Sequence, residues 1–154
     1  MSLVTIISDA SHCPKTKIGG FGFWAVSTRG RHAGSGSFKK KFRGSTPAEA
    51  SAVVNAVFIS LRLGIAAKGD RVLIQTDSLH SIHVFTGITK KCKDPDTMNA
   101  KLELAKLASK YELTFDFRHV RGHTGVDDQR SKAQRHADQR AKTAMKKARS
   151  SAAA

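Results

Sequence analysis

The chain has 154 residues, of which 40% are hydrophobic, and a formal net charge of +15 that gives an isoelectric point near 10.4. Its length and apolar content predict one domain with a hydrophobic core, and its charge favours a polyanionic partner over a small neutral substrate. No stretch approaches the ~20 apolar residues of a membrane-spanning helix, and the N-terminus shows no export signal, so we expect a cytoplasmic protein without a membrane partner.

The N-terminal part of the chain predicts three strands. An apolar run at residues 3–8 has the length of a buried strand. A turn at residues 14–20 separates it from strand-like segments at residues 21–25 and 32–38, which a hairpin turn joins. Strands connected in this way form an antiparallel meander.

A helix is expected next. Thr46 is the predicted N-cap, Pro47 the first helical residue and Glu49 the acidic residue three positions after the cap. Apolar residues then recur at the spacing of a helix that packs one face on a sheet. These residues are Ala50, Val53, Val54, Val57, Phe58, Leu61 and Ile65.

The second half of the chain predicts two strands and three helices. A second apolar run ends at Thr76, and Asp77-Ser78 caps a helix that stops before Gly87. Asp96 or Thr97 is expected to cap the next helix, which ends at Tyr111.

The last predicted strand, residues 113–120, alternates polar and apolar side chains and leads through a glycine-rich loop to a final helix. That helix carries a stripe of small residues: Ala133, Ala137, Ala141, Ala144 and Ala148. We expect a single domain over residues 1–149 and a disordered tail at residues 150–154. This order of elements predicts an α/β fold with helices on the faces of a mixed sheet.

Four acidic residues stand where a metal site would use them. Asp9 and Asp77 follow the two apolar runs, which is where open α/β sheets place their sites. Glu49 lies in the first turn of a helix, and Asp138 lies inside the last one. Carboxylates gathered from these elements would hold Mg²⁺ against a phosphate.

Each acid also has a purely structural explanation. Glu49 suits the third position of a capping box, and Asp77 is a good N-cap. Asp9 can accept hydrogen bonds in the following turn, and Asp138 can pair with Lys142 one helical turn later.

Taken together, the segments around these acids resemble the type 1 ribonuclease H family over nearly the whole chain. The matching segments are Ile7-Ser8-Asp9-Ala10-Ser11, Ala48-Glu49-Ala50, Thr76-Asp77-Ser78, Gly122-His123-Thr124-Gly125 and Ala137-Asp138. The resemblance implies a ribonuclease H-like fold, with a five-stranded mixed sheet whose first three strands form an antiparallel meander, flanked by helices.

The same resemblance implies a metal-dependent endonuclease that hydrolyses the RNA strand of RNA/DNA hybrids, leaving 5′-phosphate and 3′-hydroxyl ends. In a two-metal-ion mechanism with Mg²⁺, or Mn²⁺ as the alternative ion, Asp9 would bridge the ions, Glu49 and Asp77 would share one position, and Asp138 would complete the other. His123 would move a proton or help the product leave. The spacing from His123 to Asp138 is longer than usual for the family, which leaves Asp127 and Asp128 as rivals for the fourth carboxylate.

Substrate contacts are expected from residues around these acids and from basic runs. The residues are Ala10, Ser11, Ser45, Thr46, Lys39, Lys40, Lys41, Lys90 and Lys91. Family members commonly carry Gly at the position of Ala10, Asn residues before the helix glutamate and Gln at the position of Leu79. Backbone contacts to ribose 2′-hydroxyls survive such changes, whereas side-chain reading of the minor groove is expected to differ.

Two other functions stay open at this point. One is a non-catalytic nucleic-acid-binding module on the same fold, which has no need of a carboxylate cluster that repels phosphate. The other is a structure-specific DNA nuclease of the same superfamily. In those enzymes the helix glutamate generally follows the second strand aspartate, whereas Glu49 precedes Asp77 here. We expect a monomer that acts on RNA/DNA hybrids.

Overall fold

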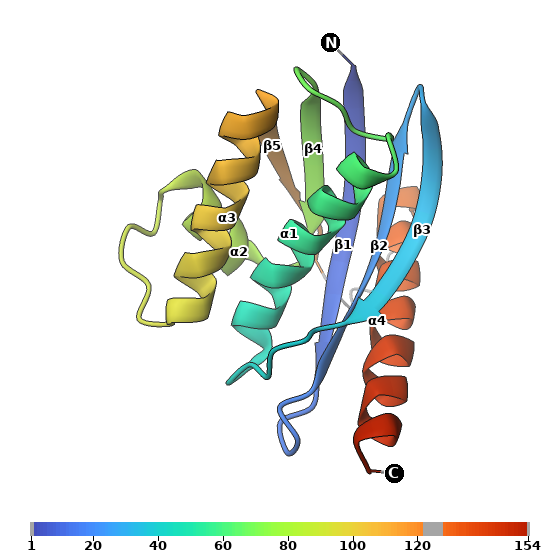
Figure 1. Ribbon diagram of the computed structural model, residues 1–154, viewed down its shortest axis with the longest axis vertical. Helices are drawn as coiled ribbons and strands as arrows, with labels where there is room; N and C mark the ends of the chain where they lie inside the picture. Colours follow the sequence, from blue (N-terminus) through green and yellow to red (C-terminus); the bar gives the residue numbers. More distant parts are fainter. Residues whose placement is uncertain (1, 122–127, 154) are drawn as a thin grey trace.

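A computed structural model describes residues 2–121 and 128–153 of the chain (Figure 1). Its elements follow one another as β1 (Leu3–His12), β2 (Gly19–Ser27), β3 (Gly30–Ser37), α1 (Ser45–Arg62), β4 (Arg71–Thr76), α2 (Leu79–Thr86), α3 (Pro95–Tyr111), β5 (Thr114–His119) and α4 (Gln129–Ala153).

The strands form one five-stranded sheet in the order β3-β2-β1-β4-β5. β1 pairs antiparallel with β2 and β2 antiparallel with β3, while β1 with β4 and β4 with β5 are parallel pairs. The expected mixed sheet with an N-terminal antiparallel meander is therefore confirmed.

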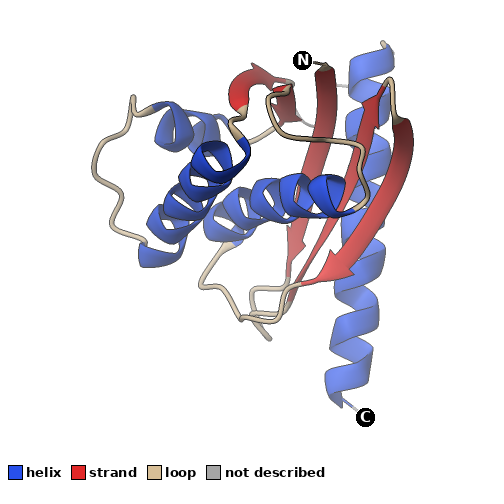
Figure 2. Ribbon diagram, turned by 45° about the horizontal axis from the view of Figure 1, so that its top comes forward, coloured by secondary structure: helices blue, strands red, loops and turns tan. Residues whose placement is uncertain are grey.

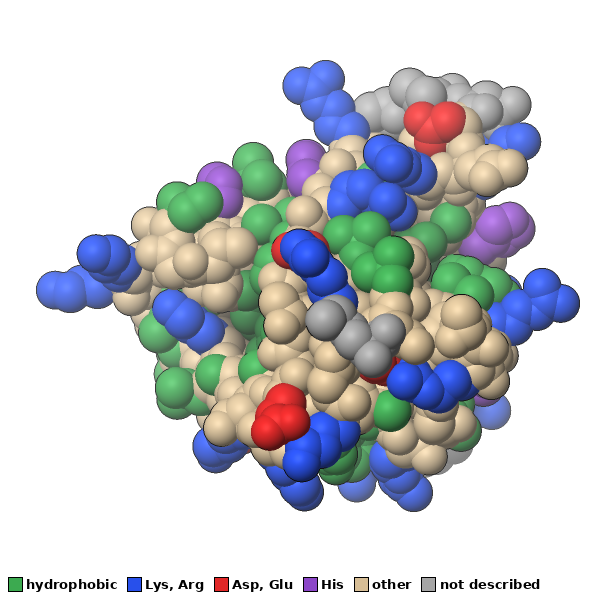
Figure 3. Space-filling model, turned by 90° about the horizontal axis from the view of Figure 1, so that it is seen from above, with side chains coloured by type: hydrophobic (Ala, Val, Ile, Leu, Met, Phe, Trp, Pro, Cys, Tyr) green, Lys and Arg blue, Asp and Glu red, His purple; other side chains and the backbone are tan. Residues whose placement is uncertain are grey.

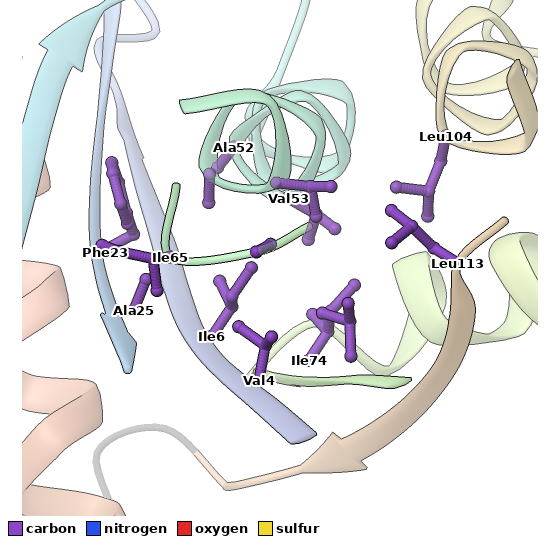
Figure 4. Close-up of a cluster of buried hydrophobic side chains, with 14 of the residues drawn as sticks. Val4, Ile6, Phe23, Ala25, Ala52, Val53, Ile65, Ile74, Leu104 and Leu113 are labelled. Atoms are coloured by element: carbon purple, nitrogen blue, oxygen red, sulfur yellow. The ribbon is translucent and has the colours of Figure 1, made fainter. Parts of the chain in front are cut away.

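Helices cover both faces of this sheet. α1 and α3 pack together on one face, and α4 lies on the other, behind β1, β2 and β3 (Figure 2). The main core fills the space between the sheet and α1 (Figure 4), with Val4, Ile6, Phe23 and Val53 fully buried there. None of the helices in the described ranges is both long and apolar enough to cross a bilayer.

Two glycines on β2 let α4 rest directly on the sheet. A Cβ atom at Gly20 would lie 2.5 Å from the backbone nitrogen of Met145, and one at Gly22 would collide with the carbonyl oxygen of Ala137. Ala137 and Ala141 are fully buried at this contact. Small side chains on both sides therefore bring the helix backbone within van der Waals distance of the strand.

The helix boundaries differ from expectation at several caps. α1 starts at Ser45 after Gly44, which is in extended conformation, and no side chain caps it, so the predicted Thr46 cap is wrong. Asp94 rather than Asp96 or Thr97 caps α3, because Pro95 occupies the first helical position and Asp94 accepts a hydrogen bond from the Asp96 amide.

The caps of α2 are as expected. The Ser78 hydroxyl accepts a hydrogen bond from the Ser81 amide, and Gly87 closes the helix at φ 84°.

The C-terminal end of α4 also differs from expectation. The helix continues through Ala153, although we expected a disordered tail from residue 150. Alanine has the highest helix propensity of all residues, so Ala152 and Ala153 favour continuation of the helix.

Candidate active site

The pairing of β1 with β4 positions Asp9 and Asp77. Their last parallel pair is Ile7 opposite Gln75, and β4 ends one residue later at Thr76. β1 continues to His12 against β2, so Asp9 lies within its strand, opposite Gly22, and does not end the strand as expected. Asp9 is 2% exposed, and Asp77 follows the end of β4 two residues after Gln75.

Glu49 reaches the same point from the first turn of α1. One carboxylate oxygen of Asp9, one of Glu49 and one of Asp77 all lie within 4.8 Å of one another. The structural explanation for Glu49 fails, because α1 has no capping box. Instead, Glu49 Oε2 is buried and has no hydrogen-bond partner. A buried carboxylate oxygen left unpaired is unfavourable unless a cation occupies its neighbourhood.

Burial and mutual repulsion shift the protonation of this cluster. Removal from water, followed by the charge of Asp77, raises the pKa of Asp9 to about 8. Burial and then the charge of Asp9 raise the pKa of Glu49 well above its ordinary value. Three carboxylates at this separation cannot all ionise without a counter-charge. The oxygen-only donor set and the unpaired Glu49 oxygen fit a hard divalent cation such as Mg²⁺.

Asp138 lies beside this cluster on α4 and is not part of the group of three. It is close enough to Asp9 to raise the pKa of that residue by hydrogen bonding and by charge. Its own carboxylate accepts from Lys142, whose Nζ lies 2.9 Å from Oδ2. The ion pair between Asp138 and Lys142, which the sequence offered as a structural explanation for Asp138, is therefore present, and it lies next to the cluster.

Asp128 makes a local contact at the start of α4. Its Oδ1 accepts a hydrogen bond from the Ser131 amide at 2.7 Å, and this contact lowers the pKa of Asp128. Asp128 is exposed just before α4 and caps that helix. Asp127, the other alternative for the fourth carboxylate, and His123 lie outside the described residues.

A chain of buried amide groups, which sequence reasoning missed, connects the elements around Asp9. Gln134 of α4 donates from Nε2 to the carbonyl oxygen of Ser8 at 2.8 Å, and Gln75 of β4 donates to Gln134 Oε1 at 3.1 Å. Arg118 of β5 donates two hydrogen bonds to Gln75 Oε1. Gln134 precedes Asp138 by one helical turn, so this network fixes the part of α4 that carries Asp138. The sequence feature that could have indicated this network is Gln75, a polar residue within the apolar run of β4.

The expected substrate-contacting residues lie on several elements. Ala10 donates its amide to Asp9 Oδ1 at 2.9 Å, and Ser11 follows on β1, both half-buried. Ser45 and Thr46 are exposed at the start of α1, one turn before Glu49.

The lysine runs lie in two connecting segments. Lys39, Lys40 and Lys41 are exposed between β3 and α1, and Lys40 forms an ion pair with Asp96 of α3. Lys90 and Lys91 are exposed in the segment between α2 and α3, which projects away from the sheet (Figure 1). Seen from above, Lys and Arg side chains project from several sides of the molecule with few acidic side chains between them (Figure 3).

In a comparison with protein families, the model of the family described as RNase H matches residues 1–146. The chain belongs to the RNase H family. This membership identifies the protein as a ribonuclease H enzyme and agrees with the five-stranded sheet and the acidic cluster. Curated protein sequences provide no match to this ribonuclease H.

Solved structures share the fold at low sequence identity. The N-terminal RNase H domain of rv2228c from Mycobacterium tuberculosis superimposes with a TM-score of 0.72 and 18% identity over 99% of both chains. RNase H1 from the halophilic archaeon Halobacterium salinarum gives 0.69 and 18%, over 94% of this chain and 98% of that one. LC11-RNase H1, isolated from compost and solved in complex with an RNA/DNA hybrid, gives 0.68 and 19% over 94% and 98%.

Proposed function

We propose that this ribonuclease H hydrolyses the RNA strand of RNA/DNA hybrids at the Asp9, Glu49 and Asp77 cluster, leaving 5′-phosphate and 3′-hydroxyl ends. The observation that carries the proposal is the group of three carboxylates around the buried Asp9, with an unpaired Glu49 oxygen. A protein that only bound nucleic acid would gain nothing from three neighbouring acids that repel phosphate. The hybrid complex of LC11-RNase H1 supports the choice of substrate.

The chain would hold two divalent cations, with Mg²⁺ the preferred ion and Mn²⁺ the alternative. Asp9 would be the ligand common to both ions, because Glu49 and Asp77 lie within 4.8 Å of it and Asp138 is close enough to raise its pKa. When bound, the ions would activate a water molecule and stabilise the leaving 3′ oxygen. Asp138, which is paired with Lys142, would supply the fourth carboxylate.

The remaining residues bind and orient the hybrid. The exposed hydroxyls of Ser45 and Thr46 stand beside the cluster at the start of α1 and donate to the sugar-phosphate backbone, while backbone groups at Ala10 and Ser11 contact ribose 2′-hydroxyls. The lysines of the two connecting segments neutralise phosphates. His123, from the glycine-rich loop, transfers a proton or helps the product to leave.

The test is cleavage of a labelled RNA/DNA hybrid with Mg²⁺ or with EDTA. We expect metal-dependent loss of the RNA strand by the wild type, and no cleavage by Asp77→Asn at undiminished hybrid binding. Asp116→Asn is the matched control, since Asp116 is an exposed strand aspartate paired with Arg71. It should cleave at the wild-type rate.

Duplex DNA, duplex RNA and single-stranded RNA complete the experiment. Hybrid binding without cleavage by the wild type would identify a binding module instead. Cleavage of duplex DNA would assign the protein to the DNA nucleases of the superfamily. Wild-type activity in Asp77→Asn would remove the cluster from the reaction.

A further inference from the structure

The flank of α4 that faces away from Asp138 carries a row of polar and basic residues next to β3. At 3.6 residues per turn, His136 and Arg140 lie about half a turn around the helix from Asp138. The buried face of α4, which contains Ala137 and Ala141, lies between these two flanks. One flank of α4 thus carries Asp138, close to Asp9, and the other carries His136 and Arg140.

Trp24 forms the wall of a cavity on this second flank. It follows Gly22 by two residues on β2, so its side chain projects from the same sheet face on which α4 packs. With Ala133, His136 and Arg140 it lines a cavity of about 270 Å³. The indole is half-buried, and the side chains opposite it are a histidine and an arginine.

A second cavity of about 620 Å³ continues along the same flank of α4. It lies between the end of β3 and the C-terminal half of the helix, and its lining is rich in hydroxyl groups. The residues are Ser35, Gly36, Ser37, Thr143, Ala144, Lys147, Ala148 and Ser151. Both cavities together follow α4 from Ala133 to Ser151, a length of about 27 Å at 1.5 Å per residue. We call this surface the α4–β3 groove.

The charge of the groove has one sign. Among the described residues, no acidic side chain lines either cavity and no ion pair engages Arg140 or Lys147. Arg140 and Lys147 are separated by two helical turns on one flank, which spaces their charges about 10 Å apart along the helix. An unpaired row of cations beside an aromatic ring is the combination that binds single-stranded nucleic acids, because bases stack on the ring and phosphates contact the cations.

We propose that the α4–β3 groove binds single-stranded nucleic acid, with a base stacked on Trp24 and phosphates held by Arg140 and Lys147. The hydroxyls of Ser35, Ser37 and Thr143 supply hydrogen bonds to the backbone of the strand. Stacking and phosphate contact are common to RNA and DNA, so the groove takes either strand. An acidic peptide would match the charge but would leave Trp24 without a stacking partner.

This site goes beyond the proposed nuclease function and does not depend on it. The groove lies on the opposite flank of α4 from Asp138, so a strand bound there leaves the acidic cluster accessible. A ribonuclease H with such a groove could hold an unpaired extension of its substrate while the paired region occupies the cluster.

Trp24 is the chain's single tryptophan and therefore reports on the groove directly. The experiment titrates the protein with twelve-residue oligo(dT) and, in a second arm, oligo(rU), in EDTA, while following tryptophan fluorescence. We expect saturable quenching by both oligonucleotides. Neutralising two phosphate contacts in Arg140→Gln/Lys147→Gln should weaken binding about tenfold and reduce the slope of log affinity against log salt by about 1.4.

The matched control is Lys106→Gln/Lys110→Gln, which removes the same charge from exposed positions on α3, across the sheet. It should keep the wild-type affinity and salt slope. Hybrid cleavage by Arg140→Gln/Lys147→Gln should proceed at the wild-type rate, which separates this site from the nuclease site.

Three results would overturn the proposal. The first is absence of quenching, and the second is equal weakening by the α3 and α4 double variants, which would mean that binding follows net charge alone. The third is displacement of the oligonucleotides by an equally charged poly-glutamate at the same concentration, which would assign the groove to an acidic protein partner. None of these results would affect the cleavage assay.

Discussion

Asp9 is 2% exposed between two other carboxylates, and its ionisation therefore opposes folding whenever no cation is bound. A carboxylic acid whose pKa rises on folding, here from 3.8 to about 8, makes the protein less stable as the pH rises above the unfolded-state value. The loss accumulates between about pH 4 and pH 8, which includes neutral pH. The cluster is thus a stability cost that binding of a divalent ion would offset.

Replacement of Asp9 by asparagine should consequently stabilise the metal-free protein. We expect a gain of about 1–3 kcal/mol at pH 7, since asparagine is neutral in both states, whereas an aspartate with a raised pKa must take up a proton when the protein folds at this pH. Urea unfolding in EDTA measures it. Mg²⁺ should stabilise the wild type and leave Asp9→Asn unchanged. A destabilised Asp9→Asn protein would show that the carboxylate makes favourable contacts even without a cation.

Asp70 presents the reverse case of a buried acid that is fully partnered. It accepts two hydrogen bonds from the guanidinium of Arg29 and one each from the amides of Ser2 and Ala67. The contact with Arg29 holds the pKa of Asp70 at about 2. No motif in the sequence distinguishes Asp70 from a loop aspartate, because its partners come from distant segments of the chain.

The depressed pKa of Asp70 sets a pH dependence of stability. A group whose folded pKa is low contributes stability that is complete above the unfolded value of about 4 and is lost as the pH falls toward 2. Since Arg29 is about one-third exposed, solvent screening reduces the contribution to about 1–2 kcal/mol. Asp70→Asn should lack this pH-dependent contribution. The difference in the free energy of unfolding between the wild type and Asp70→Asn should therefore be smaller at pH 2 than at pH 6. A constant difference between these pH values would refute the assignment.

At the scale of elements, the position of α4 depends on two glycines of β2. A Cβ atom at Gly22 would meet the backbone of α4 at Ala137 and Ala141. Because the clash is with backbone atoms, no side-chain rotation relieves it, and the helix must move away from the strand. α4 carries Asp138 and Gln134, so its displacement also changes the surroundings of Asp9.

Gly22→Ala should therefore destabilise the protein by about 2–3 kcal/mol and reduce hybrid cleavage beyond what the loss of folded protein explains. Denaturant unfolding and single-turnover cleavage measure the two effects. Gly44→Ala is the control, because a Cβ at Gly44 meets no atom within 4 Å and its extended backbone suits any residue. Equal effects of the two changes would show that the contact between Gly22 and α4 is not the cause.

The elements themselves could be predicted from periodicity, but the N-caps of α1 and α3 and the exposed flank of α4 could not. Thr46 looked like an N-cap, yet burial of Pro47 and Ala48 against the core makes the chain enter α1 earlier, at Gly44. In α4 the alanine stripe correctly marked Ala137 and Ala141, while Gln134 and Met145 complete the buried face. Helical periodicity shows which residues share one face of a helix, but it does not show which element packs against that face.

The three clustered acids could be predicted because they lie just after the paired residues of β1 and β4 and at the start of a helix, contexts that the sequence encodes directly. Their carboxylate oxygens lie within 4.8 Å of one another. For Asp138, an ion pair with Lys142 was the alternative to a metal-binding role. The structure has this ion pair, and it also has Asp138 close to Asp9, so the two roles are compatible. The amide network of Gln75 and Gln134 joins residues 59 positions apart, a contact that no local pattern predicts.

For the whole molecule, the net charge of +15 predicts that hybrid binding weakens steeply with salt. The lysines before α1 differ in their ion pairs, so we expect them to contribute unequally to this salt dependence. Lys40 is already neutralised by Asp96, whereas Lys39 and Lys41 are exposed and have no ion pair in the described part of the chain. Only an unpaired cation releases a counterion from the duplex when it binds a phosphate.

Lys39→Gln/Lys41→Gln should accordingly lower the slope of log affinity against log salt by about 1.8, at about 0.9 per phosphate contact, and Lys40→Gln should lower it by much less. Titration of a labelled hybrid in the Asp77→Asn background, where cleavage is expected to be absent, measures both slopes at several salt concentrations. Lys106→Gln/Lys110→Gln provides the charge-matched reference on α3. An unchanged slope in the first variant would mean that this segment faces away from the hybrid. An equal effect of Lys40→Gln per charge would mean that its ion pair with Asp96 opens when the hybrid binds, because a lysine released from its carboxylate becomes available to a phosphate.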